Sequence, residues 1–241
     1  KTSVNLFIHG MLGTAGIYGV LRILLMVFSK ETGKLTLSGN LSSILMLFAF
    51  VTVIIGEIGA LTEKNMKKIL AFSSMAQLGI VLFGISLGSF DALKGVLYIV
   101  ISNYLAKFVM FLTVNEFSKV SGSTNYLDMK GLGRRYPVLA ISFTISALSL
   151  MGIPFFAGFW GKISIIGNAI FSGKLELIGA VLILIASVIE GVYYLRISHT
   201  FFSQGHEREG RISRVYCLLP MILALVILFI GINPDSFENI I

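Results

Sequence analysis

Long apolar segments separated by short polar ones run along the whole chain, and this pattern predicts helices that span a membrane. Each helical span needs about 20 mainly apolar residues to cross the hydrocarbon core. Strands of a membrane barrel would alternate apolar and polar residues over about ten positions, and these segments do not alternate. We therefore expect an all-α membrane protein that forms a single membrane domain over residues 1–241. Its seven predicted spans cover residues 3–28, 37–62, 66–88, 92–118, 136–171, 175–203 and 215–232.

Composition agrees with a membrane protein and argues against several kinds of site. Charged residues make up 13% of the 241 positions, whereas soluble domains carry about a quarter. One cysteine, Cys217, is too few for a disulfide framework or a protein-bound iron–sulfur cluster. The three histidines show no metal-binding spacing, and no glycine-rich nucleotide-binding motif is present. We expect no catalytic residue, no metal and no bound cofactor in this chain.

Lysine and arginine are unevenly divided between the two sides that seven spans create. Cytoplasmic loops carry an excess of these residues, so we expect a cell (inner) membrane protein with a cytoplasmic N-terminus and the C-terminus outside. The net charge of +7 then reflects topology and not nucleic-acid binding. The cytoplasmic set is Lys1, Lys64, Lys67, Lys68, Lys119, Lys130, Arg134, Arg135, Arg208, Arg211 and Arg214, and the outer set is Lys30, Lys34, Lys94 and Lys174.

Several ionisable residues fall inside the predicted spans, where a charge at the bilayer centre costs about 2.5–3.5 kcal/mol on insertion scales. Lys107 lies near the middle of its span, far from an interface, and we interpret it as a site on an ion pathway. For four others we favour snorkelling, in which the charged end reaches a nearby interface. These four are Arg22, Glu57, Glu116 and Arg196.

A break is predicted within residues 136–171, because Pro154 removes a backbone donor and clashes with the preceding turn. Gly152, Gly158 and Gly161 loosen the same stretch. Irregular backbone at membrane depth is tolerated only where it lines protein or water. Lys162 directly follows this stretch, so we interpret it as a site that gains and loses a proton.

Two further residues at membrane depth are left with open interpretations. Glu190 lies midway along its span and is either part of the pathway or a partner for Arg196 or a neighbouring lysine. His9 is either a pathway residue or a hydrogen-bonded packing residue, which is the more frequent role of a lone histidine.

Residues 65–79 read NMKKILAFSSMAQLG, and they resemble the signature K-[RK]-x-L-A-[YF]-S-[ST] of antiporter-like membrane subunits. Such subunits occur in respiratory complex I, in membrane-bound hydrogenases and related sulfur-reducing complexes, and in Mrp-type cation/proton antiporters. Residues 4–10 are similar to the V-S-x-L-I-H helix of that family, residues 106–108 to its F-x-K-A lysine and residues 193–196 to its Y-Y-L-R motif. Residues 152–162 look like its second broken helix, so the resemblance covers nearly the whole chain.

The resemblance implies a fold and a role for individual residues. The five central spans would form the second of two inverted five-helix repeats, with one flanking helix on each side. Lys67 would be the connecting lysine, Lys107 the central lysine and Lys162 the terminal lysine, from which protons exit outwards. His9 would link the two halves of the pathway, whereas Glu190 has no fixed counterpart.

The sequence departs from the family in two respects. The family often has histidines one and two turns before the central lysine, where this chain has Asn103 and Ile99. A proton relay through this span must then depend on water. The first repeat is also absent, so the chain holds one half-channel at most.

From this resemblance we expect an ion-translocating subunit that moves H⁺, or Na⁺ against H⁺, in a redox-driven membrane complex. Its partners would be other membrane subunits, including one that supplies the first repeat, and redox subunits with iron–sulfur clusters. One alternative is a subunit of a free-standing Mrp-type antiporter without redox partners. Another is a structural half-subunit that does not conduct ions, although such a relic has no reason to bear the cost of burying lysines.

Overall fold

The computed structural model describes residues 39–205 and 212–234. Within these ranges the chain is helical and contains no strand, which confirms the all-α prediction. The predicted span at residues 3–28, with His9 and Arg22, lies outside the described residues. The described elements are α3 (Gly39–Thr62), α4 (Met66–Ser86), α5 (Phe90–Ser121), the 3₁₀ helix η2 (Tyr126–Met129), α6 (Leu132–Arg135), α7 (Pro137–Met151), α8 (Ala157–Ile170), α9 (Lys174–Phe202) and α10 (Arg214–Ile232).

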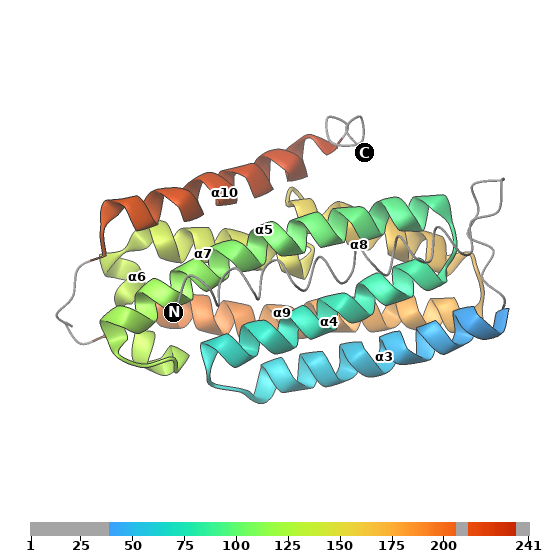
Figure 1. Cartoon of the computed structure of the whole chain (residues 1–241), viewed down its shortest axis with the longest axis horizontal. Helices are drawn as coiled ribbons and strands as arrows, with labels where there is room; N and C mark the ends of the chain where they lie inside the picture. The colour runs from blue at the N-terminus through green and yellow to red at the C-terminus, as the bar shows by residue number, and fades with distance from the viewer. Residues whose placement is uncertain (1–38, 206–211, 235–241) are drawn as a thin grey trace.

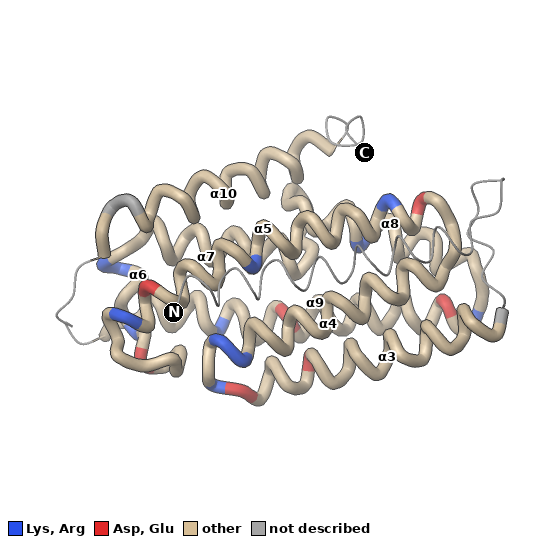
Figure 2. The backbone as a smooth tube through the Cα atoms, viewed as in Figure 1, with Lys and Arg blue, Asp and Glu red and all other residues tan. Residues whose placement is uncertain are grey.

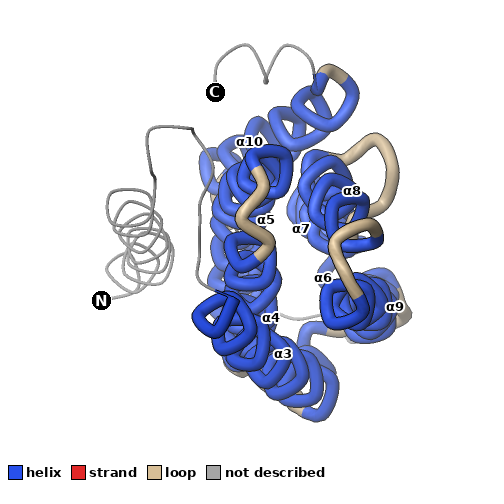
Figure 3. The backbone as a smooth tube through the Cα atoms, turned by 90° about the vertical axis from the view of Figure 1, so that its right-hand side faces the viewer, coloured by secondary structure: helices blue, strands red, loops and turns tan. Residues whose placement is uncertain are grey.

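The helices run side by side along one axis (Figure 1). Viewed end-on, α3, α4 and α5 form one layer, and α7, α8 and α9 form a second layer facing it (Figure 3). Contacts between α3 and α9 join the layers along one edge, and α10 packs on α5, α7 and α8 at the other. The two layers and α10 therefore enclose an interior, into which polar side chains of several helices project.

Local sequence signals account for many of the helix ends. The side chain of Asn65 caps α4 by accepting from the Lys67 backbone N–H, and Ser89 caps α5 in the same way. Pro137 stands in the first turn of α7, where its missing donor costs nothing. Gly122, in the left-handed conformation, ends α5.

The turn between α3 and α4 is held by a short set of hydrogen bonds. The backbone N–H groups of Lys64 and Asn65 donate to the Glu63 carboxylate, and these bonds lower the pKa of Glu63 below its usual value. The Met66 backbone N–H donates to the Thr124 carbonyl at 2.8 Å. The start of α4 is thereby fastened to the loop that follows α5.

Outward faces of the bundle are apolar, as expected for helices in contact with lipid. Four helices, α3, α4, α5 and α9, are long and apolar enough to cross a membrane. The helices α7 and α8 have 15 and 14 residues, fewer than the ~20 that a span requires. Charged residues gather towards the ends of the helices, and only a few lie midway (Figure 2). The count of seven spans and the repeat assignment remain predictions. Large exposed apolar side chains on the outward faces include Leu47, Phe48, Ile58, Leu184, Val188, Leu225 and Phe229.

Candidate functional site

Lys107 projects from the middle of α5 into the interior and is only 4% exposed. Its ammonium donates to the Ser73 hydroxyl at 2.7 Å, to the Tyr194 hydroxyl at 2.9 Å and to the Leu70 carbonyl at 3.2 Å. The Tyr194 hydroxyl in turn donates to Ser73 at 2.8 Å. All three donor positions of the lysine are thus used, and every acceptor is a neutral group.

Lys162 projects from α8 and is 5% exposed. Its ammonium lies 2.7 Å from a carboxylate oxygen of Glu190 and donates to the Ser187 hydroxyl at 2.9 Å. The other Glu190 oxygen accepts from the Gln77 amide at 2.6 Å. Glu190 is fully buried, so this is an ion pair in which both charges have additional hydrogen-bond partners. Such partners are what allow a buried ion pair to persist.

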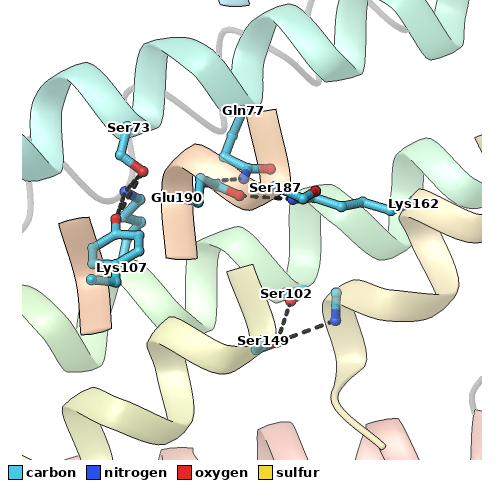
Figure 4. Close-up of polar contacts among 10 residues, drawn as sticks. Ser73, Gln77, Ser102, Lys107, Ser149, Lys162, Ser187 and Glu190 are labelled. Carbon is cyan, nitrogen blue, oxygen red and sulfur yellow. Dashed lines mark hydrogen bonds and ion pairs between the residues drawn. The ribbon is translucent and has the colours of Figure 1, made fainter. Parts of the chain in front are cut away.

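The two lysine centres are connected through α4 and α9 (Figure 4). On α4, Ser73 accepts a hydrogen bond from Lys107, and Gln77, one turn later, donates one to Glu190. On α9, Glu190 pairs with Lys162, and Tyr194, one turn later, binds Lys107. Residues four apart on a helix lie on the same face and about 6 Å apart along its axis. Lys107 and Lys162, on two other helices, therefore contact successive turns of the polar faces of α4 and α9. We call the residues that bind them the polar ladder: Ser73, Gln77, Ser187, Glu190 and Tyr194.

The helix predicted over residues 136–171 is interrupted beside Lys162. Helix α7 ends at Met151 and α8 begins at Ala157. Gly152 has φ +79°, a conformation that glycine adopts at little cost. A Cβ at Gly152 would approach the Lys162 Cδ to 2.9 Å, so this glycine also leaves room for the lysine side chain.

The predicted glycines and proline of the break occupy different places in it. Pro154 lies in the connecting segment, as expected. Gly158 and Gly161 lie inside α8, so they do not loosen the break itself. Gly161 instead permits a close approach to α5, where an added Cβ would meet Ile99. The Ser149 hydroxyl of α7 accepts from the Gly158 backbone N–H at 3.1 Å, and this bond spans the break.

A small cavity of about 10 Å³ lies between α4, α5, α7 and α8. This volume is about that needed to hold one water molecule. Asn103, Gln77 and Lys162 line it, and the Asn103 side-chain oxygen has no hydrogen-bond partner among the described residues. Asn103 stands where the family often has histidine. It thus lines a cavity that can hold a water molecule next to Lys162.

The structure does not bring every predicted site residue to this ladder. His9 lies outside the described residues. The side chain of Lys67 is exposed at the first turn of α4, away from the buried centres. Arg196 is exposed, in keeping with snorkelling, but this interpretation is wrong for Glu57 and Glu116, which are buried inside the bundle. Glu116 accepts from Lys119 and Asn115 near the end of α5.

Sequence reasoning missed the neutral members of the ladder, Ser73, Gln77, Ser187 and Tyr194. A signal was present for Ser73 and Gln77, since polar residues at four-residue spacing in an apolar span mark one polar helix face. In the described part of the chain, no group of three His, Cys, Asp or Glu side chains is placed to hold a metal.

Fold and site together define a multi-pass membrane protein with buried lysines on a polar ladder beside a broken helix. The sequence matches the family described as "NADH:quinone oxidoreductase/Mrp antiporter, TM" over residues 1–190, and the chain belongs to this family.

The named relatives include a subunit of a cation/proton antiporter and a chain of a respiratory membrane complex. The chain is 30% identical to a subunit of the Na(+)/H(+) antiporter of Bacillus subtilis (strain 168) over 208 residues, which are 86% of this chain and 40% of that protein. It is similar to a chain of the membrane-bound sulfane sulfur reductase, an archaeal respiratory membrane complex (TM-score 0.86, 31% identity, 99% of this chain and 47% of the other). It also shares the fold of a chain of the Mrp complex from Dietzia sp. DQ12-45-1b (TM-score 0.84, 22% identity, 95% and 50%). The chain spans less than half the length of the curated relatives it matches.

Proposed function

We propose that this chain forms an ion-translocating half of an antiporter-like subunit, which moves H⁺, or Na⁺ against H⁺, across a cell membrane. The observation that carries the proposal is the pair of buried lysine centres, one turn apart on the shared helices α4 and α9. Ionisable residues at membrane depth usually serve a pathway. Moving one charge against 100 mV costs about 2.3 kcal/mol, which the pathway must receive from a coupled process.

In this proposal a proton passes from the Lys107 centre to Lys162 by way of the ladder and the water-sized cavity beside Asn103. Glu190 holds the Lys162 ammonium until the proton leaves along α8 to the outside. Gly152 and Pro154 keep the backbone open at this point. Lys67 and His9 join the pathway on the family resemblance alone, as the connecting lysine and the link to the missing half.

Substitutions of Lys162 test whether its proton is the one that moves. Arginine keeps the charge but is effectively never deprotonated, so Lys162→Arg should lower ion transport about 100-fold, the scale of a lost acid–base group. Lys162→Leu should do the same, whereas Lys162→Glu, which still titrates, should retain part of the transport. Proton movement is followed with a pH-sensitive dye in inverted membrane vesicles that contain equal amounts of the chain. Wild-type transport by Lys162→Arg would show that the residue is only a fixed charge.

The coupled process that we favour is redox chemistry in partner subunits that carry iron–sulfur clusters, together with a membrane subunit supplying the first repeat. The 31% identity to a chain of an archaeal respiratory complex supports this proposal. The 30% identity to a protein of an Na(+)/H(+) antiporter supports the second candidate, a free-standing Mrp-type antiporter. Affinity purification of the chain from its own membranes distinguishes them. Paramagnetic iron–sulfur signals in the purified complex support the first, and their absence with intact membrane partners supports the second.

We further propose that the end of the bundle with Gln204 faces the cytoplasm and the end with Ser172 faces outward, from the distribution of lysine and arginine. Both residues are exposed at opposite ends of α9. In a Cys217→Ser background, a membrane-impermeant thiol reagent added to whole cells should label Ser172→Cys and spare Gln204→Cys. The reverse pattern would invert the orientation.

A further inference from the structure

Glu57, on α3, is the one acid buried in the described interior that has no hydrogen-bond donor. It is 2% exposed, and neither carboxylate oxygen has a partner among the described residues. Glu190 is equally buried, but it accepts from an ammonium and from an amide. The Glu57 carboxyl group therefore lacks the hydrogen-bond donors that Glu190 has in the same bundle.

The surroundings of Glu57 connect it to both lysine centres. The Glu57 carboxyl group lies within electrostatic range of Glu190 on α9, Lys162 on α8 and Lys107 on α5. On α9, the buried hydroxyl of Tyr193 faces the Glu57 carboxylate, although it makes no hydrogen bond of normal length to a described residue. Helix α4 packs along α3, and it adds no charge here, because its ionisable side chains, the adjacent lysines of its first turn, are exposed.

A carboxylate without donors is costly in an apolar interior, and a second carboxylate nearby raises this cost. The negative charge is therefore better placed on Glu190, whose donors stabilise it. The surroundings of Glu57 thus favour its protonated form, whereas the donors around Glu190 favour the carboxylate.

We propose that Glu57 is a proton-holding residue that exchanges its proton with Glu190 and thereby controls the Lys162 ion pair. In the forward step the O–H bond of Glu57 breaks and an O–H bond forms on Glu190, with the Tyr193 hydroxyl accepting one proton and donating its own. The total charge of the two acids is unchanged. The carboxylate 2.7 Å from the Lys162 ammonium becomes neutral, which favours release of the lysine proton. The reverse transfer restores the ion pair when Lys162 is protonated again. This inference rests on the proposed function.

Glu57→Gln tests the proposal, because glutamine matches the shape of a neutral acid but cannot release a proton. The variant should assemble with wild-type thermal stability, and its ion transport in vesicles should fall at least about tenfold. Infrared spectra of the purified complex should lose a carboxylic acid C=O band. The matched control is Glu176→Gln, an acid in the first turn of α9, which should keep both transport and the band.

Each outcome decides the question. Wild-type transport in Glu57→Gln, or an unchanged infrared band, overturns the role of Glu57. If Lys162→Leu stops transport in the same vesicles, the proposed function still stands, and if Lys162→Leu also transports normally, the proposed function itself fails. Where Glu57→Gln does not accumulate, Glu57→Asp replaces it. A shifted carboxylic acid band in that variant supports the proposal, and an unshifted one contradicts it.

Discussion

The two buried lysines hold their charge in different ways. Lys107 donates to two hydroxyls and a carbonyl, whereas Lys162 has a carboxylate and one hydroxyl. A lysine among neutral acceptors can lose its proton without leaving an opposite charge behind. A lysine in an ion pair cannot, unless its partner is neutralised at the same time. In the proposed pathway, proton release at Lys162 is therefore coupled to the charge of Glu190, whereas Lys107 has no carboxylate among its hydrogen-bond partners.

The largest expected effect comes from breaking the ion pair at one side. Glu190→Leu leaves the Lys162 ammonium buried without an opposite charge, and removing one partner of a buried pair costs about 3–5 kcal/mol. The free energy of unfolding, measured by denaturant titration in micelles, should fall by this amount. The double variant Glu190→Leu/Lys162→Leu should recover most of the loss, because apolar residues often replace a buried pair at little cost. If Glu190→Leu and the double variant have the same free energy of unfolding, the two side chains are not energetically coupled.

An intermediate loss of stability is expected from a substitution in the break between α7 and α8, which contacts Lys162. Gly152→Ala forces alanine into a left-handed conformation, which costs about 1–2 kcal/mol, and its Cβ would press on the Lys162 side chain. Ion transport should decrease together with stability. The control is Gly167→Ala on α8, where an added Cβ meets no atom within 4 Å. That variant should be neutral, or more stable by up to about 1 kcal/mol through helix propensity.

The smallest effect on stability is expected at Lys107, whose hydrogen-bond acceptors are all neutral. Lys107→Met removes a buried ammonium and keeps most of the side-chain volume, and the bond from Tyr194 to Ser73 remains. The free energy of unfolding should change by about 1 kcal/mol or less, the scale of one hydrogen bond. Ion transport should nevertheless stop. A stability loss as large as that of Glu190→Leu would remove the distinction between the two centres.

The fold could be predicted well because its signals are local. The predicted spans at 37–62, 66–88 and 92–118 correspond to α3, α4 and α5, with ends that differ by at most three residues. Asn65, Ser89 and Gly122 mark helix ends through hydrogen bonds and backbone conformations within a few residues. The interruption between α7 and α8 falls at Pro154 for the same reason. The depth of Lys107 and Lys162 in their spans follows from counting residues along a helix.

What only the tertiary structure decided is which face of each helix points inward. Lipid-facing and core-facing surfaces of these helices are both apolar, so hydrophobic periodicity does not tell them apart. The sequence therefore left Glu57 as a snorkelling residue, whereas the structure buries it. The sequence likewise left two interpretations open for Glu190. The ion pair between Glu190 and Lys162 could not be read from it, because the two residues lie 28 positions apart. Such contacts depend on how α4, α5, α8 and α9 rotate against one another, and rotation is set by packing between helices and not by the order of residues within any one of them.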